Sequence, residues 1–155
     1  MKADYLQQAI DLATENSRSG LGGPYGAVIV RDGQVLVSSA NLVTKNNDPT
    51  AHAEIVAIRS ACSRLNSFQL TDCVLYSSCE PCPMCLGAIY WARLEAVYYA
   101  CDRHDAANSG FDDGFIYDEI QRTPAQRKIP MLQVNMTDAK KPFQAWQNSQ
   151  EKIAY

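Results

Sequence analysis

Two short stretches of the chain carry side chains that bind metals. The first contains His52 and Glu54, and the second contains Cys82 and Cys85. One imidazole and two thiolates are good zinc ligands, and three protein ligands leave the fourth position of the ion open for water. A carboxylate beside that position can accept a proton from the bound water. The spacing therefore predicts a catalytic zinc site with Glu54 as its general base.

The same cysteines allow other interpretations. Cys79 could act as a fourth ligand and close a structural zinc site, which would leave Glu54 without a role. An iron–sulfur cluster of the ferredoxin type is excluded, because Ile89 stands where that pattern needs its fourth cysteine. The remaining cysteines lie beside or at the end of apolar runs and are expected to be buried and inert: Cys62, Cys73 and Cys101.

The composition limits the classes of protein to consider. The 155 residues are most simply one domain, 1–155, which is large enough to bury a core. A net charge of −3 gives no overall attraction to phosphate backbones, so no nucleic-acid partner is predicted. No apolar run approaches the ~18 residues of a membrane span, and the N-terminus lacks the apolar core of a signal peptide. We therefore predict a cytoplasmic protein with reduced cysteines and no membrane partner.

Hydrophobic periodicity predicts alternating helices and strands. Apolar positions at helical spacing predict helices around 6–13, 51–65, 83–91, 116–120 and 138–152. Short apolar runs predict strands over 27–30, 35–37, 74–76, 96–100 and 131–134, with a hairpin turn at Asp32 and Gly33. Residues 41–49 are polar and are predicted to form a loop. This alternation is typical of a layered α/β domain.

The predicted elements place both metal-binding stretches at helix starts. His52 falls in the first turn of the second helix. Cys82 and Cys85 are three residues apart, so they share one face at the start of the third helix. We expect strands 35–38 and 74–78 to pair beneath these helix starts and bring them together.

Residues 48–54 and 79–85 resemble the zinc motifs of the cytidine-deaminase-like superfamily. Within it, the whole chain is similar to bacterial guanine deaminases. The stretches that carry this similarity are 22–28, 86–93, 110–117 and 142–146, together with the final Tyr155. The match departs at Tyr25, where the family has phenylalanine. The resemblance implies a three-layer α/β/α domain with a mixed sheet of about five strands.

The resemblance also implies an activity and roles for individual residues. The implied reaction is the hydrolysis of guanine to xanthine and ammonia, in which zinc-bound hydroxide attacks C2 and Glu54 shuttles protons. Asp113 would contact the base or assist the second proton transfer. The implied Zn²⁺ ligands are His52, Cys82 and Cys85. The implied substrate contacts are Asn41, Tyr25, Ala53, Trp91, Asp113 and Tyr155.

The partner implied by the resemblance is a second copy of the chain. Residues 138–155 would be exchanged within a homodimer, so that Tyr155 closes the neighbouring site. Three alternatives remain open at this point. A tRNA adenosine deaminase shares the motif around His52, but the acidic charge and the C-terminal stretch disfavour it. A cytosine or nucleoside deaminase and a non-catalytic, zinc-stabilised binding module are the others.

Overall fold

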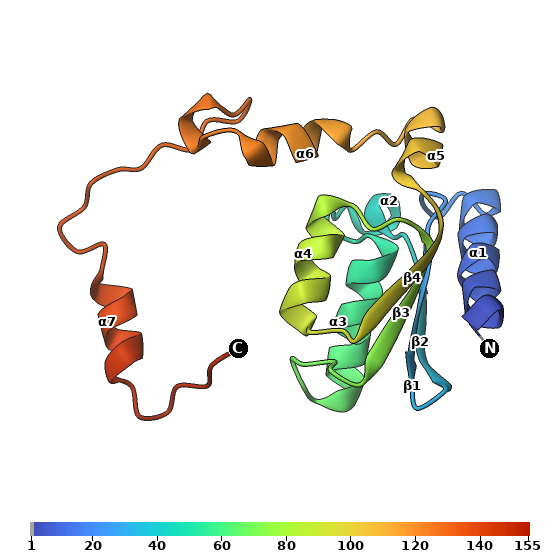
Figure 1. Cartoon of the computed structure of the whole chain (residues 1–155), viewed down its shortest axis with the longest axis horizontal. Helices are drawn as coiled ribbons and strands as arrows, with labels where there is room; N and C mark the ends of the chain where they lie inside the picture. The colour runs from blue at the N-terminus through green and yellow to red at the C-terminus, as the bar shows by residue number, and fades with distance from the viewer. Residues whose placement is uncertain (1) are drawn as a thin grey trace. The chain divides into compact units, whose positions relative to one another are not determined.

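The computed structural model describes residues 2–155, which divide into two compact units. One unit ends at Phe115, and the other spans Ile116–Tyr155. The first unit is built around a mixed sheet of four strands in the order β2-β1-β3-β4 (Figure 1). In chain order these strands are β1 (Gly26–Arg31), β2 (Gln34–Ala40), β3 (Cys73–Cys79) and β4 (Ala96–Cys101). The predicted α/β class is confirmed.

The strand directions bring several chain ends to one edge of the sheet. Strand β1 pairs antiparallel with β2 and with β3, whereas β3 and β4 run parallel. The carboxyl ends of β2, β3 and β4 therefore lie at the same edge, together with the start of β1. The predicted hairpin turn is confirmed: Asp32 and Gly33 have φ values of 51° and 72°, as a two-residue turn between β1 and β2 requires.

Helices cover both faces of this sheet. The helices of the first unit are α1 (Lys2–Arg18), α2 (Val43–Asn46), α3 (Ala53–Leu65), α4 (Pro83–Ala92) and α5 (Arg103–Asn108). Helix α6 (Gly114–Gln121) begins at the boundary of the two units, and the second unit also contains a 3₁₀ turn at Pro124–Gln126 and helix α7 (Lys141–Asn148). Helix α1 packs on one face, and α3 and α4 lie together on the other (Figure 1). Ala27 and Ile29 join the core on the α3 side, while Val28 and Val30 join the core on the α1 side. This two-residue period buries β1 on both faces.

The prediction of about five strands is wrong for the last predicted strand, residues 131–134. Residues 131–134 form no regular secondary structure, and Leu132 and Val134 are 73% and 72% exposed. A short apolar run satisfies the sequence criterion for a strand, but a strand also needs a partner for its backbone hydrogen bonds. The expected pairing of strands 35–38 and 74–78 is also wrong, because β1 lies between β2 and β3 and bonds to both.

Three helices differ from the expectation. Helix α2 lies within the stretch predicted as a loop, and α5 lies in a polar segment where no element was predicted. Asp102 is the N-cap of α5 and forms a capping box with Asp105, which stabilises a helix with little apolar periodicity. Helix α7 is shorter than the predicted 138–152. The helices found in residues 2–155 are too short or too polar to cross a membrane.

The cysteines outside the metal-binding motif differ in burial. All six cysteines of the chain are free thiols. Cys73 is buried, as predicted, and Cys62 is half-buried. Cys101 is exposed, so the prediction for it is wrong. It ends β4, an edge strand, and the apolar run before it could not reveal that position.

Candidate zinc centre

Two helix starts provide the metal-binding side chains. His52 precedes α3 and Cys82 precedes α4, and both have the extended backbone of a helix N-cap. Serine, threonine, aspartate and asparagine are usual at this position, and losing such a cap costs about 1 kcal/mol. Among the described residues, neither the imidazole nor the thiol makes a capping hydrogen bond to its own helix. Both side chains are therefore free to point toward each other.

The segment before α3 is held by a turn and by the sheet. The Asp48 carboxylate accepts hydrogen bonds from Thr50 N at 2.8 Å and from Thr50 Oγ1 at 2.7 Å. The His52 N–H then donates to the Thr50 carbonyl at 2.8 Å. One residue further on, Ser39 Oγ of β2 donates to the Ala53 carbonyl at 2.7 Å. These bonds fix the imidazole relative to the carboxyl end of β2.

The segment before α4 continues from β3. Glu80 N donates to the Cys101 carbonyl at 2.8 Å, which extends the pairing of β3 with β4 beyond the end of the strand. Pro83 occupies the first turn of α4, where its missing N–H costs nothing. Cys82 is consequently the N-cap of α4 and Cys85 lies in its first turn, both at the start of the helix as predicted.

The three donor atoms fit a zinc ion. His52 Nδ1 lies 3.5 Å from Cys82 Sγ and 3.6 Å from Cys85 Sγ. Zinc bonds of ~2.3 Å to sulfur and ~2.0–2.1 Å to nitrogen, at a tetrahedral angle, place such atoms about 3.6 Å apart. All the ligand atoms lie within 4.8 Å of one another. This geometry identifies Nδ1 as the imidazole atom that faces the metal.

Cys79 is engaged elsewhere. Its thiol lies 3.4 Å from the Asp102 carbonyl, to which it donates, and it does not belong to the metal-binding group found in residues 2–155. Burial, followed by the nearby Cys101, raises the pKa of Cys79 to about 11. The closed four-ligand interpretation therefore lacks its fourth ligand.

The ligands and the general base interact closely. The hydrogen bond from the Cys85 thiol, and then the one with His52, lower the pKa of Cys82 to about 4, while the contact with Cys82 raises the pKa of Cys85. The positive ends of α3 and α4 also favour thiolates. Glu54 is only 4% exposed, and burial raises its pKa. Its carboxyl accepts a hydrogen bond from Ser77 Oγ at 3.3 Å.

Aromatic and acidic residues of the first unit lie near this cluster. The rings of Tyr25 and Phe111 meet edge to face at 5.3 Å. That contact brings residues 111–113 toward the start of β1. Burial and then the negative charge of Cys82 raise the pKa of Asp113. The structure thus brings Tyr25 and Asp113 into the electrostatic neighbourhood of the zinc ligands.

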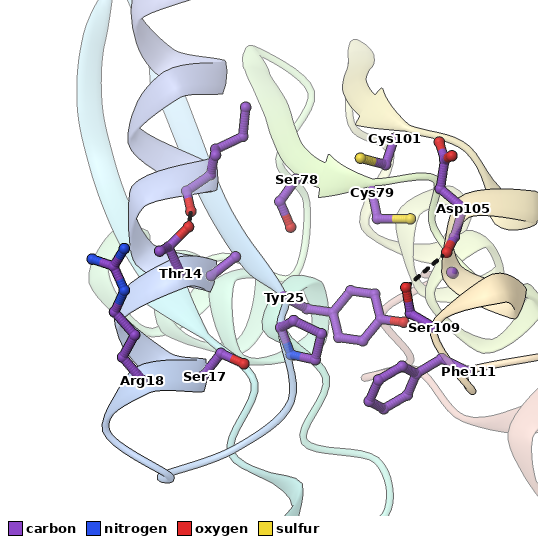
Figure 2. Close-up of a pocket in the computed structure, with 14 residues that line it drawn as sticks. Thr14, Ser17, Arg18, Tyr25, Ser78, Cys79, Cys101, Asp105, Ser109 and Phe111 are labelled. Atoms are coloured by element: carbon purple, nitrogen blue, oxygen red, sulfur yellow. Dashed lines mark hydrogen bonds between the residues drawn. The ribbon is translucent and has the colours of Figure 1, made fainter.

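A cavity of about 440 Å³ lies beside Tyr25, between α1, α5 and the ends of β3 and β4 (Figure 2). Tyr25 projects into it toward Ser109 and Phe111 (Figure 2). The cavity is lined by Cys79 but by none of the three zinc ligands. It therefore adjoins the zinc centre through Tyr25 and does not contain it.

The other residues implied by the family resemblance occupy different places. Asn41 is buried at the end of β2, and Ala53 is fully buried at the start of α3. Trp91 is 68% exposed and lies nine residues after Cys82, about 13 Å along the axis of α4 at 1.5 Å per residue. Tyr155 belongs to the second unit, in which it is 72% exposed. Their roles at the site stay predictions.

Two residues near the site, Ser77 and Asn16, were not predicted from the sequence. Ser77 bonds to Glu54, and nothing in the strand pattern marks it apart from the other serine of β3. Asn16 is buried on α1 and bonds to the backbone of Asn41. A signal for Asn16 does exist, because the helical period places it on the buried face with Ala9 and Ala13.

Three donors suited to zinc and an adjoining buried carboxylate define the centre of a zinc-dependent hydrolytic deaminase. The chain belongs to the family of the cytidine and deoxycytidylate deaminase zinc-binding region, which matches residues 1–101.

Similarity to known proteins extends beyond that region. The chain is 56% identical to the guanine deaminase of Bacillus subtilis (strain 168) over 151 residues, 97% of either protein. The X-ray structure of a B. subtilis guanine deaminase matches with a TM-score of 0.97 and covers 99% of this chain and 98% of that one. A tRNA-specific adenosine deaminase of Aquifex aeolicus is 46% identical over 77 residues, which is 50% of this chain and 51% of that protein.

We predict that the purified protein binds about one zinc ion per chain and that His52→Ala and Cys82→Ala abolish this binding. Each change removes one of three ligands. The matched control is Cys79→Ser, which should retain the metal because Cys79 bonds to the Asp102 carbonyl instead. Elemental analysis after removal of loosely bound metal measures the stoichiometry. Full zinc content in both ligand variants, or its loss in Cys79→Ser, would contradict the assignment.

Proposed function

We propose that this chain is a guanine deaminase, which converts guanine and water to xanthine and ammonia. The buried carboxylate of Glu54 beside the three zinc-binding atoms supports the reaction class. Guanine is proposed as the substrate because of how much of the chain is similar to a guanine deaminase. Identity with the B. subtilis guanine deaminase spans 97% of both proteins, well beyond the zinc-binding region.

The residues of the site divide the chemistry between them. His52, Cys82 and Cys85 would hold zinc, which when bound lowers the pKa of a coordinated water from near 16 to roughly 7. Glu54 takes a proton from the attacking water and delivers it to N3 of guanine, which makes C2 more electrophilic. The water oxygen bonds to C2. The hydroxyl group now on C2 gives up its proton and becomes the C2 carbonyl, the 2-amino nitrogen receives that proton through a side chain of the site, its bond to C2 breaks, and ammonia leaves xanthine behind.

Glu54 is well placed for these transfers. Ser77 holds its carboxyl group, and burial excludes bulk water from it. Asp113 is the second candidate for the proton that the leaving amine needs. Its position near Cys82 and its partial burial suit either that transfer or a hydrogen bond to the base.

The remaining contacts concern recognition of the purine. Tyr25 would form one wall for the flat ring, and Ala53 would line the pocket at the start of α3. Asn41 would bond to the purine edge. Trp91 lies near the far end of α4 and is exposed, so we propose that it contacts the purine only when a second copy of the chain is bound.

A tRNA adenosine deaminase remains the second candidate for the activity. The similarity to the tRNA-specific adenosine deaminase of A. aeolicus covers 50% of this chain, against 97% for the B. subtilis guanine deaminase. An enzyme of that kind also needs attraction for a phosphate backbone and room for a flipped nucleotide. The net charge of −3 offers no such attraction overall, so we favour the free base.

We predict that the zinc-loaded protein deaminates free guanine and that Glu54→Gln lowers the turnover by about 10²–10⁴-fold, the usual value of general acid–base catalysis. Glutamine keeps the shape of the side chain but cannot exchange protons. Ultraviolet spectroscopy at saturating guanine measures the rate, with adenosine, cytidine and guanosine as competing substrates.

The assay separates the candidate functions. Activity on guanine alone supports the proposal, whereas turnover of adenosine or cytidine in place of guanine would contradict it. Equal turnover of guanosine would mean that the pocket admits a ribose. Wild-type rates in Glu54→Gln with full zinc content would exclude Glu54 as the proton shuttle.

We also propose a cytoplasmic homodimer in which residues 138–155 are exchanged. The support lies in the second unit, where large apolar side chains are exposed on a short helix and the tail. These are Phe143 (72%), Trp146 (44%), Ile153 (68%) and Tyr155 (72%). Such exposure at a chain terminus is unfavourable unless the side chains dock on another surface. Exchange of identical segments between protomers requires only a hinge.

For this exchange we predict that deleting residues 153–155 leaves zinc content intact and sharply lowers guanine turnover, because Tyr155 would close the site. Mixing the tail-deleted chain with the Glu54→Gln chain then tests the geometry. If tails act between subunits, the mixed dimer joins an intact tail to an intact zinc site and recovers activity. A mixed dimer that forms by mass spectrometry and stays inactive would show that each tail closes its own site.

A further inference from the structure

We propose that Asn16 is a positioning residue that holds Asn41 with its side-chain amide nitrogen directed to the substrate. Asn16 lies on α1, outside both zinc motifs, and it does not touch the zinc ligands. The inference rests on the proposed function for the identity of the substrate, but the contacts that carry it are independent of that function.

Asn16 connects two segments of the site. Its side chain is 6% exposed, and its Nδ2 atom donates to the Gly23 carbonyl and to the Asn41 carbonyl, both at 2.9 Å. A side-chain amide has two N–H groups, so these two bonds use both. Asn16 thereby ties the turn before β1 to the end of β2.

The packing around these bonds leaves no spare space. A Cβ atom at Gly22 would lie 2.2 Å from the Asn41 carbonyl oxygen and 2.9 Å from Asn16 Nδ2. Only a glycine fits against the bonded pair. The Asn41 carbonyl is therefore fixed on one side by Asn16 and on the other by the backbone at Gly22.

The side chain of Asn41 has one free end. Its Oδ1 atom accepts hydrogen bonds from Gly23 N at 3.3 Å and from Val43 N at 3.2 Å. Backbone N–H groups can only donate, so this arrangement sets the amide orientation without ambiguity between oxygen and nitrogen. Asn41 Nδ2 bonds to none of residues 2–155.

The backbone next to Asn41 leads directly to the zinc centre. Asn41 N donates to the Tyr25 carbonyl at 3.0 Å, and Leu42 N donates to the Ala51 carbonyl at 2.9 Å, one residue before His52. A side chain that offers only N–H donors there recognises acceptors such as O6 and N7 of guanine. It gives no partner to the exocyclic amino group at the equivalent position of adenine. Asn16 would thus act on substrate recognition through Asn41.

The test is a double-mutant cycle on the zinc-loaded protein. Asn16→Asp keeps the shape of the side chain but removes both donors when ionised and one of the two when protonated. Thr14→Val is the control, since it removes an exposed hydrogen bond to Ile10 on the same helix. We expect Asn16→Asp to raise KM for guanine about tenfold, the value of one hydrogen bond. The same change should have little further effect on KM when Asn41 is already alanine. An equal rise in KM in both backgrounds, or none in either, would overturn the proposal.

A second readout does not depend on the substrate. Hydrogen exchange of the Gly23 and Val43 backbone amides, followed by NMR, reports the bonds to Asn41 Oδ1. We expect faster exchange at both amides in Asn16→Asp and unchanged exchange in Thr14→Val. If the wild type does not deaminate guanine, the proposed function fails, and this measurement still decides the positioning role. Unchanged exchange in Asn16→Asp would overturn it.

Discussion

The meeting of two helix N-termini is the arrangement on which the rest of the site depends. His52 and Cys82 occupy the N-cap positions of α3 and α4, where a short polar side chain would stabilise each helix. The chain gives up this stabilisation and places metal donors there instead. In return, the positive ends of both helices face the thiolates, so the fold itself favours the charged form that zinc requires.

The sheet explains why these helix starts can meet. Strands β2, β3 and β4 end at one edge, and β1 begins there. Asn41 follows β2, the cysteine motif follows β3, and the segment that leads to Asp113 follows β4. Ligands in α/β proteins commonly bind beyond the carboxyl ends of strands, because the loops from separate strands converge there. Tyr25, just before β1, completes the same edge.

The sequence predicted this centre well because its donors are chemically distinctive and close in the chain. A histidine, a carboxylate and two cysteines at these spacings have few other uses. The same reasoning could not find Ser77, since its role comes only from a partner distant in sequence, and the helical period could mark Asn16 as buried but not reveal its partners. Strand pairing was equally hidden: continuous apolar runs predict strands 27–30 and 96–100 alike, yet β1 lies inside the sheet and β4 at its edge. The apolar run at 131–134 resembles a strand but has no partner, and Cys101 follows an apolar run yet lies at an exposed edge.

The central claim is that three protein ligands hold zinc and leave one position for a light atom. X-ray absorption at the zinc edge of the loaded protein measures this coordination directly. The account predicts two sulfur atoms at ~2.3 Å and two nitrogen or oxygen atoms at ~2.0–2.1 Å, one of them from His52 and the other from water. A shell with three sulfur atoms would identify Cys79 as a fourth protein ligand, and with it a closed structural site, and would contradict the account.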